Sequence, residues 1–165
     1  NKFGLKMVDT IINQSKLNSK GIYSSVGTYN FTEMLQLLEN LSNNTNISID
    51  NLLLTYGEYF FYSLKNSYPD LLSIYKDPIE LLASVENHIH VEVIKIYPDA
   101  ELPTFEVIEK TPDSLIMIYK SSRAMHYFAL GLMNETFKHF NVSSNIVLKK
   151  IKDDGTEVQF IVKKD

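Results

Sequence analysis

The spacing of apolar residues changes once along this chain, near Pro103, and that change limits the folds open to it. Before Pro103, apolar residues recur at helical spacing in several segments. After it, short segments rich in β-branched and aromatic residues form two pairs, each joined by a turn-forming loop. Helices followed by hairpins are typical of the α+β class. We therefore predict a mainly helical N-terminal subdomain followed by a four-stranded antiparallel sheet with an inserted helix.

The helices predicted before Pro103 have clear start signals at three positions. Asn30, Ser48 and Asp77 each offer a side-chain oxygen to the free N–H groups of a first helical turn. The helices run through Leu5–Ile12, Met34–Leu41, Leu52–Leu64 and Pro78–Tyr97, with a short helical piece at Asp70–Tyr75. The predicted strands are Thr104–Ile108, Leu115–Ser121, Asn145–Ile151 and Thr156–Val162, and the helix Ala124–Phe140 lies between the two hairpins.

Composition narrows the class of protein. The length of 165 residues fits one domain over residues 1–165, and the net charge of −4 argues against a general nucleic-acid binder. No apolar run reaches the ~18 residues needed to cross a bilayer, and the N-terminus lacks the apolar core of a signal peptide, so we expect a cytoplasmic protein. The absence of cysteine excludes disulfides and every cysteine-containing zinc or iron–sulfur site.

Two histidines lie on the predicted helix Pro78–Tyr97, on different faces. His88 is about 200° away from His90 around the helix and lies on a solvent-like face. His90 shares its largely apolar face with residues at helical spacing, namely Ala83, Glu86, Val93, Ile94 and Tyr97. Only His90 is therefore expected to point inward. From the helix alone, a core histidine bonded to a carbonyl and a metal-ligating histidine are both open interpretations.

The strand that starts at Leu115 ends in polar residues. Alternation would place its polar end on one side with the apolar residues, in the order Leu115, Met117, Tyr119, Ser121, Arg123. A phenol, a hydroxyl and a guanidinium aligned in this way suit a pair of carboxylates. A strand end whose polar side chains are simply solvated is the alternative.

The order of these features resembles a known family. A helix histidine before Ile96-Tyr97-Pro98, then Pro103, then Tyr119-x-Ser121-x-Arg123 leading into a helix is similar to the haem-nitric oxide/oxygen binding (H-NOX) pattern. The soluble guanylate cyclase sensor domain shares that pattern. Further similar segments make the resemblance cover almost the whole chain: Gly21-Ile22-Tyr23, Gly27-Thr28-Tyr29 and Tyr56-Gly57-Glu58-Tyr59-Phe60-Phe61.

The resemblance implies a cofactor and a role for each motif residue. It implies haem b (iron protoporphyrin IX) between the two subdomains, with His90 as the proximal iron ligand. It implies that Tyr119, Ser121 and Arg123 bind the haem propionates and that Pro103 presses on the porphyrin. It also places a further helix before Lys2-Phe3-Gly4; this sequence begins after it, which leaves part of the wall on the gas-binding side undefined.

Phe128 decides which gas the resemblance implies. Members that bind dioxygen carry a tyrosine at this position, and phenylalanine has no hydrogen-bond donor. We therefore predict binding of nitric oxide (NO) and carbon monoxide and exclusion of dioxygen. Tyr127 is adjacent but lies about 100° around the helix. The alternatives are an oxygen-binding sensor whose donor comes from Tyr127 or the preceding helix, and a haem-free ligand-binding or interaction module.

The resemblance also implies how the signal is made and received. NO would weaken the iron–His90 bond, and the freed helix would shift the protein between two packings. Bacterial members of this kind report to a histidine kinase or a cyclic-di-GMP enzyme. We expect the same type of partner here, and no enzymatic activity, because sensing needs neither a nucleophile nor a substrate site.

Overall fold

The computed structural model describes residues 2–24 and 27–165, which form two compact units. Unit 1 ends at Leu52, and unit 2 comprises Leu53–Asp165. Residue 1, which the expected domain includes, lies outside the described residues. All the residues singled out for a chemical role in the sequence belong to unit 2.

Unit 1 contains α1 (Leu5–Asn13) and α2 (Phe31–Thr45). The cap predicted for α2 is confirmed, since Asn30 Oδ1 accepts a hydrogen bond of 3.0 Å from the Thr32 N–H. Glu33, three residues beyond Asn30, is buried, and its carboxylate accepts bonds from the Ser19 hydroxyl at 2.6 Å and the Tyr23 hydroxyl at 2.9 Å. Glu33 thus ties the segment that follows α1 to α2.

The predicted helix Pro78–Tyr97 is interrupted by a π-helical turn. It begins with α5 (Pro78–Ala83), where Asp77 caps as predicted, accepting from the Ile79 N–H at 2.8 Å. The π-helix η1 (Val85–Ile89) follows, and the N–H of His90 bonds to the carbonyl of Val85, five residues back. The helix then resumes as α6 (His90–Ile96). Before α5 lie α3 (Ile49–Ser67) and α4 (Pro69–Ser73).

The four-stranded antiparallel sheet is confirmed, and so is the α+β class. The strands are β1 (Thr104–Lys110), β2 (Ser114–Lys120), β3 (Ser144–Lys150) and β4 (Glu157–Lys164), in the spatial order β1-β2-β4-β3. A bulge between Val107 and Glu109 shifts the register of β1 against β2. Elsewhere the pairing is regular, so the side chains of β2 and β4 alternate cleanly between the two faces.

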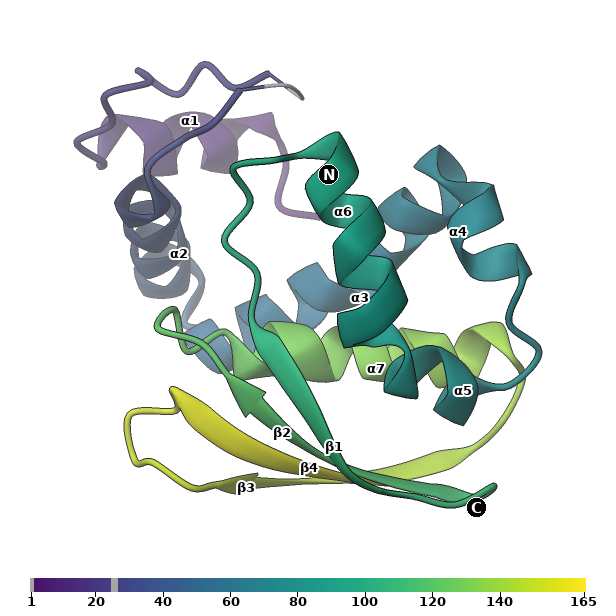
Figure 1. The fold of residues 1–165 in the computed structure, drawn as a ribbon. Helices are drawn as coiled ribbons and strands as arrows, with labels where there is room; N and C mark the ends of the chain where they lie inside the picture. The colour runs from purple at the N-terminus through teal and green to yellow at the C-terminus, as the bar shows by residue number, and fades with distance from the viewer. Residues whose placement is uncertain (1, 25–26) are drawn as a thin grey trace. The chain divides into compact units, whose positions relative to one another are not determined.

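One face of the sheet forms the centre of the core. The fully buried residues of β2 and β4 are Leu115, Met117, Tyr119, Val158, Phe160 and Val162. α5 and α7 (His126–His139) lie over this face in Figure 1 and contact strands of the sheet. Because β2 carries Tyr119 into this core, the packing of the sheet fixes the position of that phenol.

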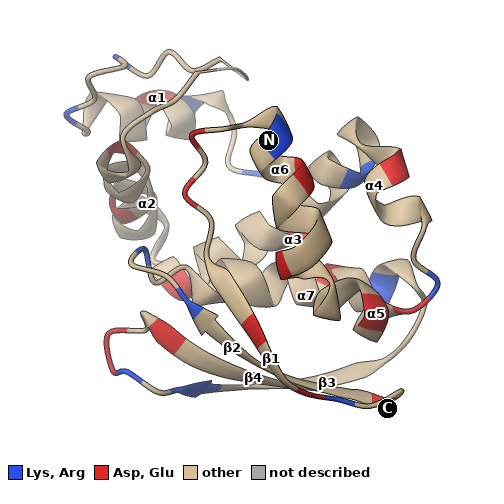
Figure 2. Cartoon of the chain, in the orientation of Figure 1, with Lys and Arg blue, Asp and Glu red and all other residues tan. Residues whose placement is uncertain are grey.

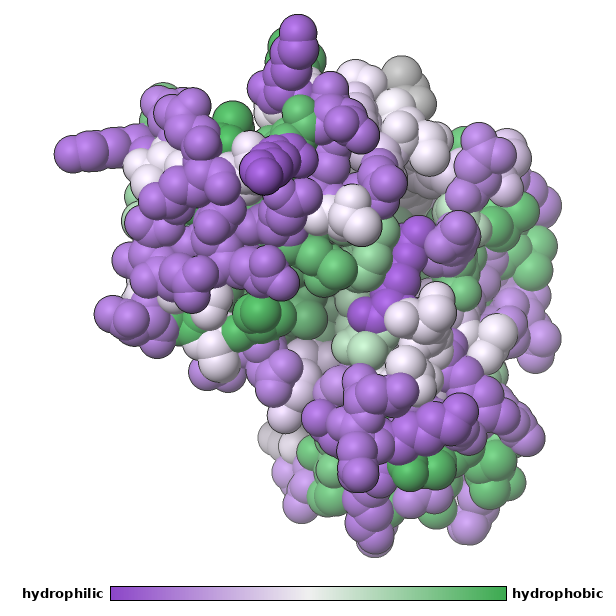
Figure 3. All heavy atoms as spheres, turned by 90° about the vertical axis from the view of Figure 1, so that its left-hand side faces the viewer, coloured by the Kyte–Doolittle hydropathy of each residue, from purple (hydrophilic) through white to green (hydrophobic). Residues whose placement is uncertain are grey.

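The surface of the described residues is mixed. Figure 2 shows acidic and basic residues interspersed along helices and strands, and Figure 3 shows a mostly hydrophilic face broken by apolar patches. No helix in the described part of the chain is long and apolar enough to cross a membrane.

Two glycines allow α3 and α7 to approach closely. A Cβ added to Gly57 would lie 2.2 Å from the Phe128 carbonyl oxygen, and one added to Gly131 would lie 2.2 Å from the Leu54 carbonyl oxygen. These are contacts with helix backbone, which cannot rotate away as a flexible side chain would. The pair therefore fixes the distance between the two helices, and with it the position of Phe128.

Replacing Gly131 with alanine is expected to destabilise the protein. Alanine gains about 1 kcal/mol of helix propensity, but forcing the helices apart costs several kcal/mol, so we expect a net loss of about 2 kcal/mol. A loss of that size lowers the melting temperature by roughly 4–8 °C. Thermal unfolding followed by circular dichroism measures it, with Asn66→Ala on the exposed side of α3 as control. An unchanged melting temperature for Gly131→Ala would contradict the close packing.

Candidate functional site

His90, the first residue of α6, lies against the start of the sheet. Its side chain is 15% exposed, and its ring centroid lies 5.8 Å from that of Phe105 on β1. Phe105 in turn packs edge-on against Tyr119 at 5.5 Å. Burial lowers the pKa of His90, and the nearby Glu86 carboxylate only partly opposes this shift. The imidazole is therefore neutral at neutral pH, which is the form that coordinates metals.

Glu86, on η1, contacts His90 from the preceding turn. Its Oε2 lies 3.4 Å from His90 Nδ1. The same oxygen accepts a hydrogen bond of 2.9 Å from the backbone N–H of Phe105. The sequence placed Glu86 on the same helix face as His90, which is confirmed, but gave no sign of the bond to β1.

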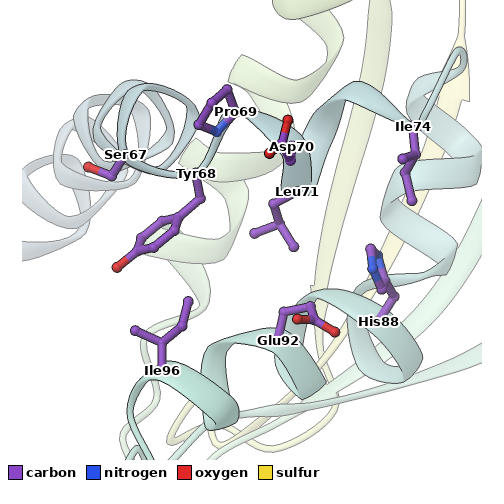
Figure 4. A pocket seen from close by; sticks show the side chains of 9 residues that line it. All are labelled: Ser67, Tyr68, Pro69, Asp70, Leu71, Ile74, His88, Glu92 and Ile96. Carbon is purple, nitrogen blue, oxygen red and sulfur yellow. The ribbon is translucent and has the colours of Figure 1, made fainter.

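His88 does not lie on a solvent-like face, and that expectation is wrong. Its Nδ1 lies 2.7 Å from the Tyr75 hydroxyl, which also accepts a bond of 2.6 Å from the Ser84 hydroxyl. The half-buried ring lines a pocket of about 360 Å³ that α4 helps to form (Figure 4). Tyr75, in the segment after α4, contacts His88 and Ser84, and the spacing of residues 78–97 carries no information about those contacts.

Tyr119 is buried at the end of β2, as the alternation predicted. Its hydroxyl oxygen accepts a bond of 2.9 Å from the Met125 N–H. Burial raises the pKa of Tyr119, although hydrogen bonds from Ser121 and Met125 act against the shift. The phenol therefore stays protonated at neutral pH and can donate its hydrogen.

Ser121 and Arg123 do not continue the alternation of β2, which corrects the prediction. The strand ends at Lys120, and a turn closes with the Ala124 N–H bonded to the Ser121 carbonyl at 3.3 Å. The Ser121 hydroxyl accepts from the Arg123 N–H at 3.2 Å. The Arg123 guanidinium donates to the Glu101 carboxylate at 2.7 Å. Arg123 therefore binds a carboxylate, but from a turn and not from an extended strand.

Pro103 is half-buried and stands directly before β1, two residues after Glu101. It therefore lies in the segment that joins α6 to β1, between the partner of Arg123 and the aromatic neighbour of His90. The structure thus places Pro103 between Glu101, the partner of Arg123, and Phe105, the ring that packs on His90.

Phe128 on α7 belongs to an aromatic cluster that the sequence did not reveal. Its ring centroid lies 5.1 Å from that of Tyr56 and 5.5 Å from that of Phe60, both on α3. Tyr127 packs against His126 instead, at 4.9 Å. Gly57 and Gly131, which bring α3 and α7 together, are a sequence signal that could have indicated this cluster.

The donor set fits a haem better than a bare metal ion. Among the described residues, no group of three or more His, Asp or Glu side chains is placed to hold a metal. One neutral imidazole beside an aromatic ring needs a macrocycle to complete an iron site. Arg123, already bonded to a carboxylate, and the protonated Tyr119 are suited to carboxylate groups such as propionates.

Comparison with known proteins agrees with this chemistry. The family model described as haem-NO-binding matches residues 1–148. A search of curated proteins finds no match. The Fe(II) unliganded H-NOX protein from K. algicida is 71% identical, with a TM-score of 0.97 over 99% of this chain and 89% of that chain.

More distant structures share the fold. The H-NOX from Shewanella woodyi, solved in the Fe(II)CO state with IWP-051 bound, is 33% identical, with a TM-score of 0.83 over 99% of this chain and 87% of that one. An S. oneidensis H-NOX protein in the Fe(II)NO state has a TM-score of 0.89 at 19% identity, over 99% and 91% of the two chains. The chain therefore belongs to the H-NOX family of haem-binding gas sensors.

Proposed function

We propose that this protein binds haem b through His90 and senses NO, with carbon monoxide as a second ligand and dioxygen excluded. The observation that carries the proposal is the inward, neutral imidazole of His90, packed on Phe105, in a chain that matches the haem-NO-binding family model. When bound, the haem would supply a ferrous iron able to take up a diatomic gas. His90 would be the protein ligand of that iron.

The exclusion of dioxygen rests on Phe128. Bound dioxygen carries partial negative charge and is stabilised by a hydrogen-bond donor, whereas NO depends far less on one. A donor contributes roughly 1–3 kcal/mol, and Phe128 has none to offer. Its ring instead packs on Phe60, which also lacks a donor, and on Tyr56, which carries a hydroxyl. Tyr56 is therefore the residue to exclude experimentally as an alternative donor.

Arg123, Tyr119 and Ser121 would anchor the haem propionates, and Pro103 would press on the porphyrin. The support for the anchor is that the Arg123 guanidinium already binds the exposed carboxylate of Glu101 at 2.7 Å. A propionate presents the same chemical group. Because Glu101 lies two residues before Pro103, exchange of one carboxylate for the other would also free the segment that leads into β1.

Replacing Arg123 with alanine is expected to speed haem loss about 10- to 100-fold, because a charge-assisted hydrogen bond contributes about 1.5–3 kcal/mol. The axial ligand should be unchanged. Transfer of haem to excess apomyoglobin measures the rate. Glu101→Gln is the matched control and should retain haem at least as well as the wild type. If Arg123→Ala lost haem no faster than the wild type, Arg123 would not bind a propionate, and its only role would be the ion pair with Glu101.

The signal would come from His90. Release of the imidazole would free α6 and η1 from their link to the sheet and shift the protein between two packings. We further propose that a cytoplasmic histidine kinase or cyclic-di-GMP enzyme of a bacterium reads this change and that the chain itself catalyses no reaction. The support for this partner class and for the absence of catalysis is family membership alone.

Absorption spectra of the purified ferrous protein test the proposal. We expect a Soret band under argon, new bands with NO and with carbon monoxide, and the spectrum of the gas-free ferrous protein on brief exposure to air. A stable shift of the ferrous spectrum in air would favour the oxygen-binding alternative. If the protein shows no Soret band after reconstitution with haemin, the result would favour the other alternative, a haem-free ligand-binding or interaction module.

A further inference from the structure

One carboxylate oxygen links the candidate ligand histidine to the sheet. Glu86 Oε2 accepts the backbone N–H of Phe105 at 2.9 Å and lies 3.4 Å from His90 Nδ1. Glu86 belongs to η1, His90 begins α6, and Phe105 is the second residue of β1. Three successive elements of the fold therefore meet at this oxygen.

We propose that Glu86 is a positioning residue that orients His90 and strengthens it as an iron ligand, a role that rests on the proposed function of His90. An imidazole whose Nδ1–H points to a carboxylate keeps its lone pair on Nε2, the nitrogen that remains free for a metal. A carboxylate partner also makes the imidazole a stronger electron donor. Glu86 therefore selects both the tautomer and the basicity of the ligand.

The bond to Phe105 is what makes Glu86 suited to this role. A free glutamate side chain has several rotamers, and the side chain of Glu86 is 39% exposed. Without a fixed partner, its carboxylate would turn away from His90 and be hydrated. The backbone N–H of a paired strand is a fixed donor, so it holds Oε2 in place beside the ring. The ring itself is packed on the Phe105 side chain, so the same residue of β1 positions both members of the pair.

The arrangement also gives β1 a direct link to the ligand. If the His90 ring moves, its 3.4 Å contact from Nδ1 to Oε2 changes, and the shared oxygen would transmit that change to the first residues of the strand. The path from His90 to the sheet therefore runs through a polar contact as well as through ring packing. A variant that removes only the carboxylate of Glu86 leaves the packing of His90 on Phe105 intact. The contribution of the polar contact can therefore be measured apart from that of the ring packing.

Glu86→Gln in the full, haem-loaded protein is the test. The glutamine amide oxygen still accepts the Phe105 N–H, so the fold is preserved, but the negative charge beside His90 is lost. We expect a lower iron–histidine stretching frequency in the resonance Raman spectrum of the ferrous protein and a higher midpoint potential. Haem affinity should fall by about tenfold, the lower end of the range for losing a side chain that bonds to a metal ligand.

Glu92→Gln is the matched control, because it removes the same charge from the same helical segment where the carboxylate pairs with Lys95. It should leave the stretching frequency unchanged. If Glu86→Gln also leaves the frequency unchanged while His90 is shown to be the ligand, Glu86 only fastens η1 to β1 and the inference is wrong. If His90→Gly keeps an axial histidine on the iron, the proposed function fails, and this inference fails with it.

Discussion

Replacement of His90 with glycine is expected to abolish haem retention, and added imidazole to restore it. His90 is the half-buried imidazole that faces Phe105, and glycine leaves a space of its own size beside that ring. The loss should exceed the 10- to 100-fold typical of removing a hydrogen-bond partner of a metal ligand, since the proposed ligand itself is removed; we expect roughly 100-fold or more. The ratio of Soret to protein absorbance after gel filtration, with and without imidazole, measures the effect.

His88→Ala is the natural control for that experiment. It removes the hydrogen bond to Tyr75 and should lower the free energy of unfolding by about 1 kcal/mol. The Soret band should be unaffected, because His88 lines the pocket that α4 helps to form (Figure 4) and is not the proposed ligand. Loss of haem from His88→Ala together with its retention by His90→Gly would reverse the assignment of the ligand.

Phe128→Tyr is expected to create dioxygen binding, which we propose the wild-type protein lacks. The new hydroxyl supplies a donor worth roughly 1–3 kcal/mol, which corresponds to about 5- to 150-fold in affinity. An oxygen titration of the ferrous protein, followed by absorption, gives the dissociation constant. NO binding should change much less, because its complex with ferrous iron depends weakly on a donor.

Two further variants identify any other donor. Tyr56 packs on Phe128, and Tyr127 precedes it, so Tyr56→Phe and Tyr127→Phe are compared with the wild type in the same titration. Neither should alter oxygen binding. If the wild type bound dioxygen and Tyr56→Phe abolished it, the donor would come from α3 and the exclusion argued from Phe128 would be wrong.

Much of the fold followed from local sequence signals. Caps are short-range features, so Asn30 and Asp77 identified helix starts that the structure confirms. Alternation depends only on the pleat of a strand, and it correctly placed Leu115, Met117 and Tyr119 on the buried face. For the site, helical phase was enough to place Glu86 and His90 on the same face of their helix.

What the sequence did not show depends on contacts between distant segments. The burial of His88 comes from Tyr75 and α4, which the spacing within residues 78–97 cannot reveal. Glu33 resembles part of a helix cap, but its carboxylate is bound by Ser19 and Tyr23, far back along the chain. The turn at Ser121–Ala124 ends the strand at Lys120, three residues before the Arg123 to which alternation was carried, because no apolar position marks that end.

The π-helical turn at Val85–Ile89 is equivalent to an α-helix into which one residue has been inserted. Deleting one residue from this turn would let α5 and α6 join as a regular helix, with every backbone hydrogen bond retained. The helix would still begin at the Asp77 cap, and α6 would keep nearly the same rotation about its axis, because five residues of a π-turn cover about the same angle as four residues of an α-turn. His90 would therefore still face Phe105, while the wider turn that carries Glu86 would be lost. The extra residue in this turn bears on the position of Glu86 more than on the direction of His90.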